Sequence, residues 1–530
     1  MPAGKPHSGA RPAIPGKLAP GMRLPRELVA ESQRARLGIA LVELVDAQGF
    51  AGTSLADLTA RAHVARAAFY EHFGGMEGCF TAAYDEHLAR GAGQLVTAYN
   101  APGMEDGERA HAALSALAAF AQVWPAAARV CLGDVLTVAH GTVEAREQLA
   151  EGAHALLDSA LGPDGAHTNR APVLVTATIG AIRRALYVHL RERPPRELLA
   201  LAELLHDWVL VYGSDLPARD AGGDGAGANG EDGAGAGDRS RMGLGAGGVL
   251  DDVESLSGDM GSRSLTHDDG PKERILAAVL RLAANGEGES ISLADIAAGA
   301  GVSFGTFYKH FRTSQDALLA ACEAVHERLI EQAREAYAAA LDGPVLDDAL
   351  AAAPDGPVGD DALAVVRQLA AGDDDELTSA LGWSAALAAA APAWATGIAR
   401  ALGAYLAAAA ADPAATRTMV LGSLSLGRPG LDFLDRRAQA LKQLLGPGLR
   451  AHPDLPAATA DMLVGAILEV VHDHALRGQL ERLPELHGQL TYIVLVPLLA
   501  AHEGGVHAEH LLETPHASTT IAAKRTRARR

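Results

Sequence analysis

The chain repeats one pattern of residues at a constant separation of 238 positions. Residues 54–58 read SLADL and residues 69–73 read FYEHF, and the pattern returns as SLADI at 292–296 and FYKHF at 307–311. Identical residues extend the match upstream and through its middle: Arg36/Arg274, Ala40/Ala278, Leu44/Leu282, Ala60/Ala298, Ala62/Ala300 and Val64/Val302. A repeat this long indicates tandem copies of a whole domain and excludes a solenoid.

The composition favours an all-α fold. Hydrophobic residues make up 48% of the 530 residues but aromatic residues only 4%, so alanine and leucine must supply most of the core. Helix-forming residues dominate, and alternating strand patterns are scarce. The three cysteines, Cys79, Cys131 and Cys322, have no C-x-x-C spacing. They therefore predict neither a disulfide framework nor a zinc module, and they favour a reducing cytoplasm.

Each copy of the pattern predicts two short helices joined by a tight turn and preceded by a longer supporting helix. In the first copy the supporting helix should end near Gly49. Ser54 stands at an N-cap position, with Asp57 three residues on as in a capping box. The next short helix should begin near Ala65, and a longer helix should begin near Glu77. The second copy predicts the same elements 238 residues later. This arrangement is a helix-turn-helix unit.

The residues around the second short helix also carry a family signature. They are Ala300-Gly301-Val302-Ser303-x-Gly305-x-Phe307-Tyr308-x-His310-Phe311 and, in drifted form, Ala62-His63-Val64-Ala65-x-Ala67-x-Phe69-Tyr70-x-His72-Phe73. This pattern resembles the DNA-binding signature of the tetracycline-repressor (TetR) family of bacterial transcription regulators. The resemblance implies a helical ligand-binding domain after each unit, whose last two helices form a four-helix dimer interface. Residues 173–191 with 196–212, and 461–477 with 483–499, fit these helices.

Composition and resemblance together predict seven segments. Residues 214–270 hold twelve acidic and four basic residues among many glycines, which is typical of a flexible linker. The expected segments are a flexible basic arm (1–30), a first helix-turn-helix domain (31–90), a first helical regulatory domain (91–213), the acidic linker (214–270), a second helix-turn-helix domain (271–328), a second helical regulatory domain (329–512) and a basic tail (513–530).

The resemblance implies that the helices at 66–70 and 304–308 enter the major groove. The expected DNA-binding residues are Ser54, Arg66, Ala67, Ala68, Tyr70 and His72 in the first copy, and Ser292, Ser303, Phe304, Gly305, Thr306, Tyr308, Lys309 and His310 in the second. Arg66 is the best candidate for a base contact, because a guanidinium can bind O6 and N7 of guanine together. Phe304 and Thr306 offer a thymine-methyl contact or one hydrogen bond. Tyr70, Tyr308 and Lys309 suit phosphate, as do Ser54 and Ser292 at helix N-termini.

Other residues of the pattern suit a structural role or depart from the family. Phe69, Phe73, Phe307 and Phe311 are expected in the core, because their spacing places them against the supporting helix. His72 and His310 have two roles open, a contact near the DNA backbone or a bridge inside the small domain. The departures are Glu71, which would lie close to DNA, Met76 and Ser314 in place of a lysine, His63 in place of the turn glycine, and Ala65 in place of the cap.

No catalytic, cofactor or metal site is predicted. The chain has no G-x-S-x-G, no P-loop and no dinucleotide fingerprint in a strand-to-helix setting. His472 and His474 flank Asp473, but residues two apart point to different faces of a helix, so we expect a solvated helix edge there. The apolar stretch 385–424 is interrupted by Pro392, Arg400 and Asp412 before about 20 apolar residues accumulate, so no membrane span is expected.

We therefore expect a cytoplasmic repressor that binds double-stranded DNA and is released by a small apolar ligand. Its two units would pair as an intramolecular pseudo-dimer on a non-palindromic site, or the chain would form a homodimer. The alternative is a ligand-sensing or protein-interaction module in which one or both units no longer bind DNA. A net charge of −20 favours this alternative, although residues 1–73 carry nine basic against six acidic residues. The sequence leaves open the ligand, the operator, and repression against activation.

Overall fold

The computed structural model describes residues 25–50, 52–104, 106–134, 172–193, 197–210, 270–285, 291–341, 365–366, 387 and 391–502. These residues form 17 α-helices and no strand, which confirms the all-α fold. The predicted linker apart from Gly270, the predicted tail 513–530 and residues 1–24 of the predicted arm lie outside this part of the chain. The first helix begins at Arg26, inside the segment that we expected to be a flexible arm.

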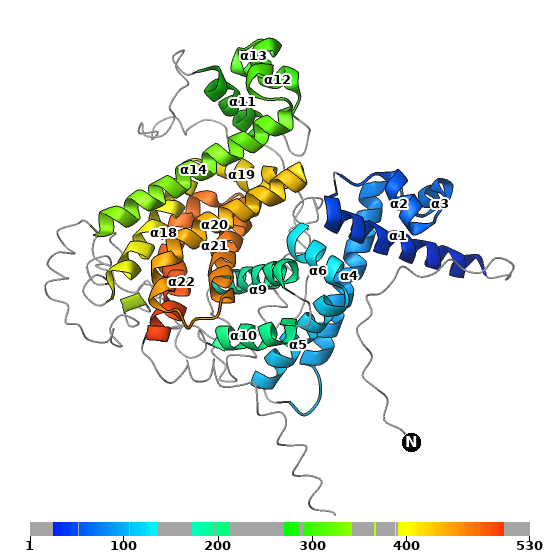
Figure 1. Ribbon diagram of the computed structural model, residues 1–530, viewed down its shortest axis with the longest axis horizontal. Coiled ribbons are helices and arrows are strands. Elements are labelled where there is room, and N and C mark those ends of the chain that lie inside the picture. The colour runs from blue at the N-terminus through cyan, green and yellow to red at the C-terminus, as the bar shows by residue number, and fades with distance from the viewer. Residues whose placement is uncertain are drawn as a thin grey trace, which may run out of the picture.

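The first half begins with the helix-turn-helix domain and continues into the helices of the segment predicted as a regulatory domain (Figure 1). Its elements are α1 (Arg26–Gln48), α2 (Leu55–Ala62), α3 (Arg66–His72), α4 (Met76–Tyr99), α5 (Asp106–Val123), α6 (Pro125–Arg129), the π-helix η1 (Val130–Asp134), α9 (Pro172–Glu192) and α10 (Leu198–Leu210). The ends of α1 and α2 and the start of α3 agree with the predicted positions.

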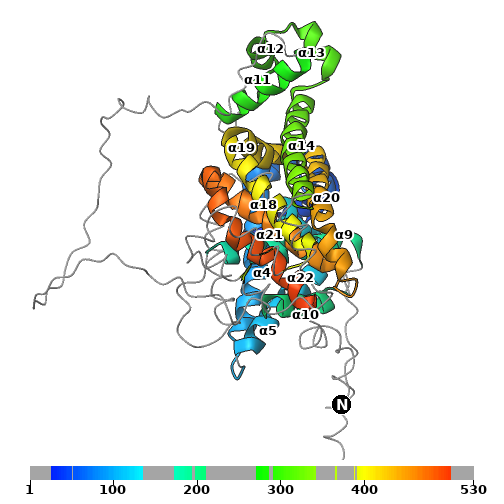
Figure 2. The ribbon, with the colours of Figure 1, turned by 90° about the vertical axis from the view of Figure 1, so that its left-hand side faces the viewer.

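The second half repeats this order. Its elements are α11 (Pro271–Asn285), α12 (Leu293–Ala300), α13 (Phe304–His310), α14 (Ser314–Leu341), α18 (Ala393–Ala411), α19 (Pro413–Leu421), the 3-10 helix η4 (Gly422–Leu426), α20 (Arg428–Ala451), α21 (Ala458–Arg477), the 3-10 helix η5 (Leu480–Leu486) and α22 (His487–His502). The long helix α14 carries the second helix-turn-helix domain at its N-terminal end, away from the rest of the molecule (Figure 2).

The two helix-turn-helix domains are joined to the body differently. Leu58 and Phe69, in the core of the first domain, belong to the same hydrophobic cluster as buried residues of both segments predicted as regulatory domains. Ile296, Phe307 and Phe311, in the core of the second domain, form a separate cluster with the start of α14. The buried positions of Phe69, Phe307 and Phe311 confirm their predicted structural role. The second domain is thus the more independent folding unit.

Helices α9 and α21 cross at the centre of the molecule (Figure 1). Gly180 and Gly465 lie at the crossing, and a Cβ atom on either residue would come within 3.0 Å of the carbonyl oxygen of the other. The Cβ on Gly180 would also meet Glu469, and the Cβ on Gly465 would meet Arg184. Both pairs are separated by 285 residues, the offset that aligns Gly180-Ala181-Ile182 with Gly465-Ala466-Ile467 in the sequence. Equivalent positions of the two halves therefore face each other.

Ion pairs of one polarity connect the halves beside this crossing. Arg183 of α9 pairs with Glu469 of α21 at 2.5 Å, and Arg184 lies 3.4 Å from Asp461. Arg191, at the end of α9, pairs with Asp435 of α20 at 2.5 Å. The first half supplies the arginine each time and the second half the carboxylate. The charges of the two halves are therefore complementary.

One helix is long and apolar enough to cross a membrane, the segment Val173–Glu192 of α9, and the described residues contain no other unbroken one. The sequence had instead suggested residues 385–424 as the stretch closest to a membrane span. In the structure 61% of its most apolar window is buried, because the helix packs against α21. Two of its arginines, Arg183 and Arg184, pair with carboxylates of α21, and Arg191 pairs with a carboxylate of α20.

Candidate nucleic-acid interface

A serine caps the first short helix of each helix-turn-helix domain. Ser54 Oγ accepts a hydrogen bond from the Asp57 N–H at 3.1 Å and donates one to the Asp57 carboxylate at 2.6 Å. Ser292 and Asp295 repeat both bonds at the start of α12. The predicted capping pairs are thus confirmed. Each hydroxyl is already engaged, so the free backbone N–H groups of the first turn are the groups left to bind a phosphate.

The turn after this helix requires a left-handed backbone. Gly301 has φ +61° at this position, and His63 has φ +51° at the equivalent position of the first copy. His63 is the single non-glycine residue with positive φ among the described residues. An L-residue with a side chain is strained by about 1–2 kcal/mol in this conformation. The predicted loss of the turn glycine is therefore accommodated by strain and not by a different turn.

An arginine of the supporting helix holds each turn in place, and this arginine is buried in the first copy and partly buried in the second. Arg36 Nη1 lies 3.5 Å from the carbonyl oxygen of His63, and Arg274 Nε donates to the carbonyl oxygen of Ala300 at 3.2 Å. Both acceptors lie at the C-terminal end of the preceding short helix, where carbonyl groups lack partners within the helix. The repeated arginine pair Arg36/Arg274 therefore has a structural role.

The helices α3 and α13 expose the same positions to solvent. Tyr70 and Tyr308 are 52% and 57% exposed, and Phe304 is 52% exposed. Arg66, equivalent to Phe304, is also exposed, and its guanidinium lies 5.9 Å from the centre of the Tyr70 ring. This distance allows a cation–π contact, which holds the two side chains on one face of α3. The first turn of each helix is thus an accessible surface with different chemistry in the two copies.

The remaining predicted contact residues divide between accessible and engaged positions. Ser54, Ala67, Ser292, Ser303, Gly305, Lys309 and His310 are exposed, and Ala68, His72 and Thr306 are partly buried. His72 Nε2 lies 2.8 Å from Gln33 Oε1 on α1. Pro271 occupies the position equivalent to Gln33, so His310 has no such partner. The bridge inside the domain, one of two roles open for these histidines, is formed by His72 alone.

The second copy is the better capped. Ser303 Oγ accepts from the Thr306 N–H at 3.1 Å, and at the start of α14 Thr313 and Asp316 exchange two hydrogen bonds of 3.0 Å. The equivalent helices of the first copy, α3 and α4, have no side-chain cap. A missing cap costs about 1 kcal/mol. The missing caps and the strained turn together predict that the first helix-turn-helix domain is less stable than the second.

One bidentate ion pair connects the first helix-turn-helix domain to the helices that follow it. Arg129 of α6 binds both carboxylate oxygens of Asp46 on α1, at 2.7 and 2.6 Å, and donates to the carbonyl oxygen of Leu190 on α9 at 3.2 Å. The hydrogen bonds to Asp46 raise the pKa of Arg129 above its ordinary value. Ala284 replaces the acid at the equivalent position of α11. No local pattern predicts this contact, because 83 residues separate its partners.

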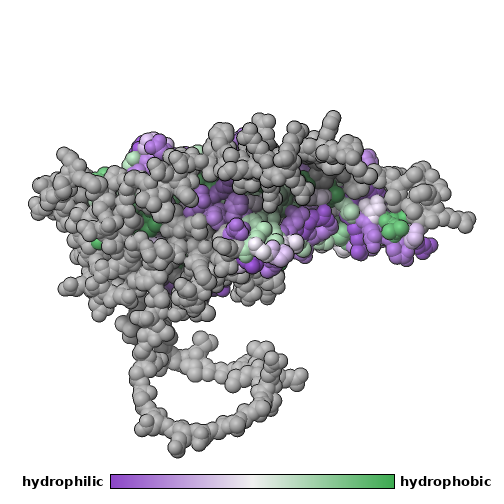
Figure 3. Space-filling view, turned by 90° about the horizontal axis from the view of Figure 1, so that it is seen from below, coloured by the Kyte–Doolittle hydropathy of each residue, from purple (hydrophilic) through white to green (hydrophobic). Residues whose placement is uncertain are grey.

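The surface seen from below mixes hydrophilic and apolar side chains. In this view the coloured part carries mainly hydrophilic residues with small apolar patches between them, and no large continuous apolar area is visible among these residues (Figure 3). Of the eight large apolar side chains that are exposed among the described residues, three lie on α3 and α13, namely Tyr70, Phe304 and Tyr308.

One prediction outside this interface is wrong. We expected His472 and His474 on a solvated helix edge, but His472 is 4% exposed and faces a cavity between the halves. His474 Nδ1 lies 2.9 Å from the carbonyl oxygen of Val470 in its own helix. The helical period placed the two histidines on different faces correctly. It did not show that α9 and α20 cover one of those faces.

The family comparison agrees with the geometry of the two domains. Residues 40–83 and 275–322 each match the family described as bacterial regulatory proteins, tetR family. A solved structure of a TetR-like transcriptional regulator from Rhodococcus sp. RHA1 is 22% identical and covers 36% of this chain and 100% of its own length, with a TM-score of 0.30. No curated protein matches the chain.

Proposed function

We propose that this chain, two segments of which match the tetR family of bacterial regulatory proteins, is a transcription regulator and not an enzyme. In this proposal it is a repressor that a small ligand releases from DNA. Its two units would act as a pseudo-dimer within one polypeptide. The observation that carries the proposal is the crossing of α9 and α21 at Gly180 and Gly465.

The crossing has the pattern of an isologous interface. In such an interface each position of one partner meets its own equivalent, or exchanges contacts reciprocally, around a twofold axis. Here Gly180 faces Gly465, and the neighbours that each would touch, Glu469 and Arg184, are themselves equivalent. An interface that two identical chains would build is thus formed between the halves of one chain.

The ion pairs favour pairing within the chain over pairing between like halves. A symmetric contact between two first halves would bring Arg183 and Arg184 against their own copies. A symmetric contact between two second halves would bring the carboxylate of Glu469 against its own copy, and this side chain is only 4% exposed. Like charges at a buried contact cost several kcal/mol. The intramolecular arrangement avoids both.

The two helices expected to enter the major groove, α3 and α13, predict an asymmetric operator because their exposed residues differ. Arg66 suits guanine in the major groove, whereas Phe304 at the equivalent position suits a thymine methyl group. Both side chains are exposed. A pseudo-dimer with unequal reading helices should therefore prefer two different half-sites. Its helices must meet successive major grooves about 34–36 Å apart, and a ligand that changes this separation would release the protein.

The test combines the mass of the full-length protein in solution with a footprint on DNA upstream of its own gene. We expect a particle of 54.6 kDa that protects an asymmetric site of two half-sites. A dimer on a symmetric site would contradict the pseudo-dimer. No salt-dependent retention on DNA at low ionic strength would instead favour a sensing or interaction module.

A further inference from the structure

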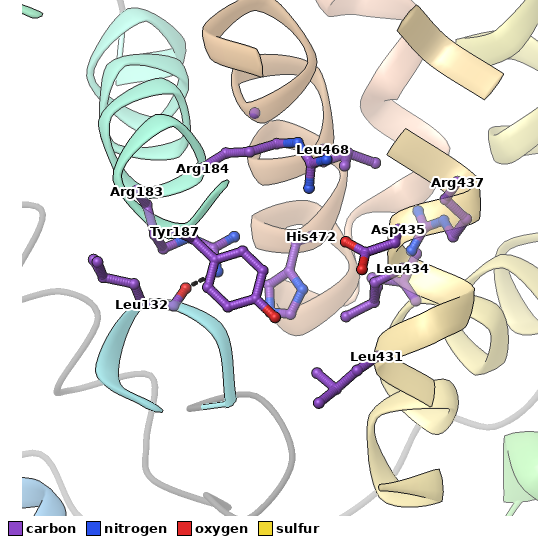
Figure 4. Close-up of a pocket in the computed structure, with 12 residues that line it drawn as sticks. Leu132, Arg183, Arg184, Tyr187, Leu431, Leu434, Asp435, Arg437, Leu468 and His472 are labelled. Carbon is purple, nitrogen blue, oxygen red and sulfur yellow. Dashed lines mark hydrogen bonds between the residues drawn. The ribbon is translucent and has the colours of Figure 1, made fainter. Parts of the chain in front are cut away.

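A cavity lies at the junction of the two halves, beside the crossing of α9 and α21 (Figure 4). Helix α9 lines it with Arg183, Arg184 and Tyr187 from one side, and α20 lines it with Asp435 and Arg437 from the other. His472 and Leu468 of α21 lie between them. The cavity volume is about 70 Å³, which is room for several water molecules or for one small organic molecule.

Arg437 is the residue that identifies the chemistry of this cavity. It is 3% exposed, and its Nε has no hydrogen-bond partner. Its guanidinium lies 5.9 Å from the centre of the Phe433 ring on its own helix, and its charge also acts on the buried His326. Within the described residues no carboxylate pairs with it. A buried charge without a counter-charge is costly, so this position calls for an anion.

The carboxylates near the cavity are already paired. Asp435 binds Arg191 at 2.5 Å, and Glu469 binds Arg183 at 2.5 Å. Asp461 is shared by Lys442 at 2.6 Å and Arg184 at 3.4 Å. Asp435 lines the cavity, but its charge is balanced by Arg191. The positive charge of Arg437 is thus left over after the local pairs are formed.

The rest of the lining is largely apolar. Leu132, Val420, Leu431, Leu434 and Leu468 contribute aliphatic side chains. The sequence predicted a small apolar ligand, but this lining combines aliphatic walls with a guanidinium. The planar fork of a guanidinium matches a carboxylate with two parallel hydrogen bonds.

We propose that this cavity binds a small carboxylate with an aliphatic body, whose carboxylate pairs with Arg437. The inference rests on the proposed function, because it names the class of ligand that would release the protein from DNA. Two wall residues, Leu132 and Val420, occupy equivalent positions 288 residues apart. Leu132 lies in η1, directly after α6, which holds α1 through Arg129 and Asp46, and Val420 lies in α19, which packs on α11. A ligand in this cavity would therefore contact elements that support both helix-turn-helix domains, η1 in the first half and α19 in the second.

The test uses full-length protein and titration calorimetry with sodium butyrate as the probe. Butyramide supplies the same body without charge, and inorganic phosphate supplies charge without an aliphatic body. We expect butyrate to bind with a dissociation constant on the order of micromolar to millimolar, and the two controls to bind at least tenfold more weakly. Equal binding of butyramide or of phosphate overturns the proposed class, as does no binding of butyrate.

Three variants locate the site. Arg437→Met should weaken butyrate binding at least tenfold, and Arg437→Lys should weaken it less because the charge remains. Arg436→Met is the matched control, since Arg436 is the next residue of α20, is half exposed and pairs with Glu323; it should bind butyrate like the parent. Without ligand, Arg437→Met should melt no lower than the parent, because a buried unpaired charge is removed. An equal loss in Arg436→Met overturns the site.

A separate measurement of DNA affinity distinguishes this inference from the function on which it rests. If butyrate binds through Arg437 but leaves DNA affinity unchanged, the site stands and release by ligand fails. If the protein binds DNA but not butyrate, the regulator stands and the site fails.

Discussion

Gly180 and Gly465 face each other so closely that neither can carry a side chain while α9 and α21 keep their present separation. Each glycine lies in the interior of a long helix, where it is normally unfavourable by about 1 kcal/mol relative to alanine. Two residues that weaken their own helices are therefore placed at the one point where the halves come closest. Close approach of the backbones is the physical reason for both.

Gly180→Ala and Gly465→Ala should each lower the free energy of unfolding by about 1–3 kcal/mol, because the new methyl group overlaps the opposite backbone. Denaturant unfolding of the full-length protein measures this. Gly93→Ala is the control, since Gly93 lies inside α4 with no atom within 4 Å of the added Cβ. It should be neutral or stabilising by up to about 1 kcal/mol. Equal effects at all three positions would contradict the close crossing.

Reversing one charge between the halves should destabilise the protein, and reversing both should restore part of the loss. Arg183→Glu leaves the buried Glu469 beside a like charge, which should cost about 3 kcal/mol or more. The double variant Arg183→Glu with Glu469→Arg should be more stable than this single variant. Arg482→Glu, in an exposed pair with Glu485, should change stability by less than about 1 kcal/mol. Additive effects in the double variant would show that the pair is not coupled.

His63→Gly should stabilise the first helix-turn-helix domain by about 1 kcal/mol, because glycine adopts the left-handed conformation without strain. Gly301→Ala should destabilise the second domain by a similar amount, and no neighbour lies within 4 Å of its added Cβ. Hydrogen exchange of residues 55–72 and 293–310 reports each domain separately. Protection unchanged in both variants would mean that these turns relax locally.

Arg66→Ala should lower affinity for the selected operator about 5- to 150-fold and relax the preference at one base pair. Lys309→Ala should instead weaken binding to all sequences and reduce the slope of affinity against salt by about one. Titrations at two or more salt concentrations separate these effects. Arg90→Ala on α4 serves as the control, since Arg90 pairs with Glu86 and lies outside both reading helices. A base preference that survives Arg66→Ala would remove Arg66 as the reading residue.

His326 should make the protein less stable in mild acid. Burial, with the charges of Arg437, Arg334 and Arg436, lowers the pKa of His326 to about 3. The unfolded chain binds this proton near pH 6.5, so stability present above that pH is lost progressively as the pH falls toward 3. His326→Gln should reduce the loss of unfolding free energy between pH 7.5 and 5.0 by up to about 2 kcal/mol. Denaturant titrations at both pH values measure it; equal losses in parent and variant would contradict this role.

The sequence by itself determined the two helix-turn-helix domains. Their elements depend on contacts between residues close in the chain, such as Ser54 with Asp57 and Ser303 with Thr306. Such caps, the turn residues and the helical spacing of apolar side chains can be read locally. The repeat then predicted the same elements twice, and the family match at both copies agrees with this prediction.

Only the tertiary structure decided how the halves meet. The sequence paired Gly180 with Gly465 as equivalent residues, but it did not show that they touch. It likewise gave no sign that Arg183 pairs with Glu469, that Arg129 holds Asp46, or that His472 is buried. Helical periodicity identifies which face of a helix is apolar, but the residue that covers that face can lie hundreds of positions away. The repeated motif therefore specified the reading units, and long-range packing specified their pairing and the cavity between them.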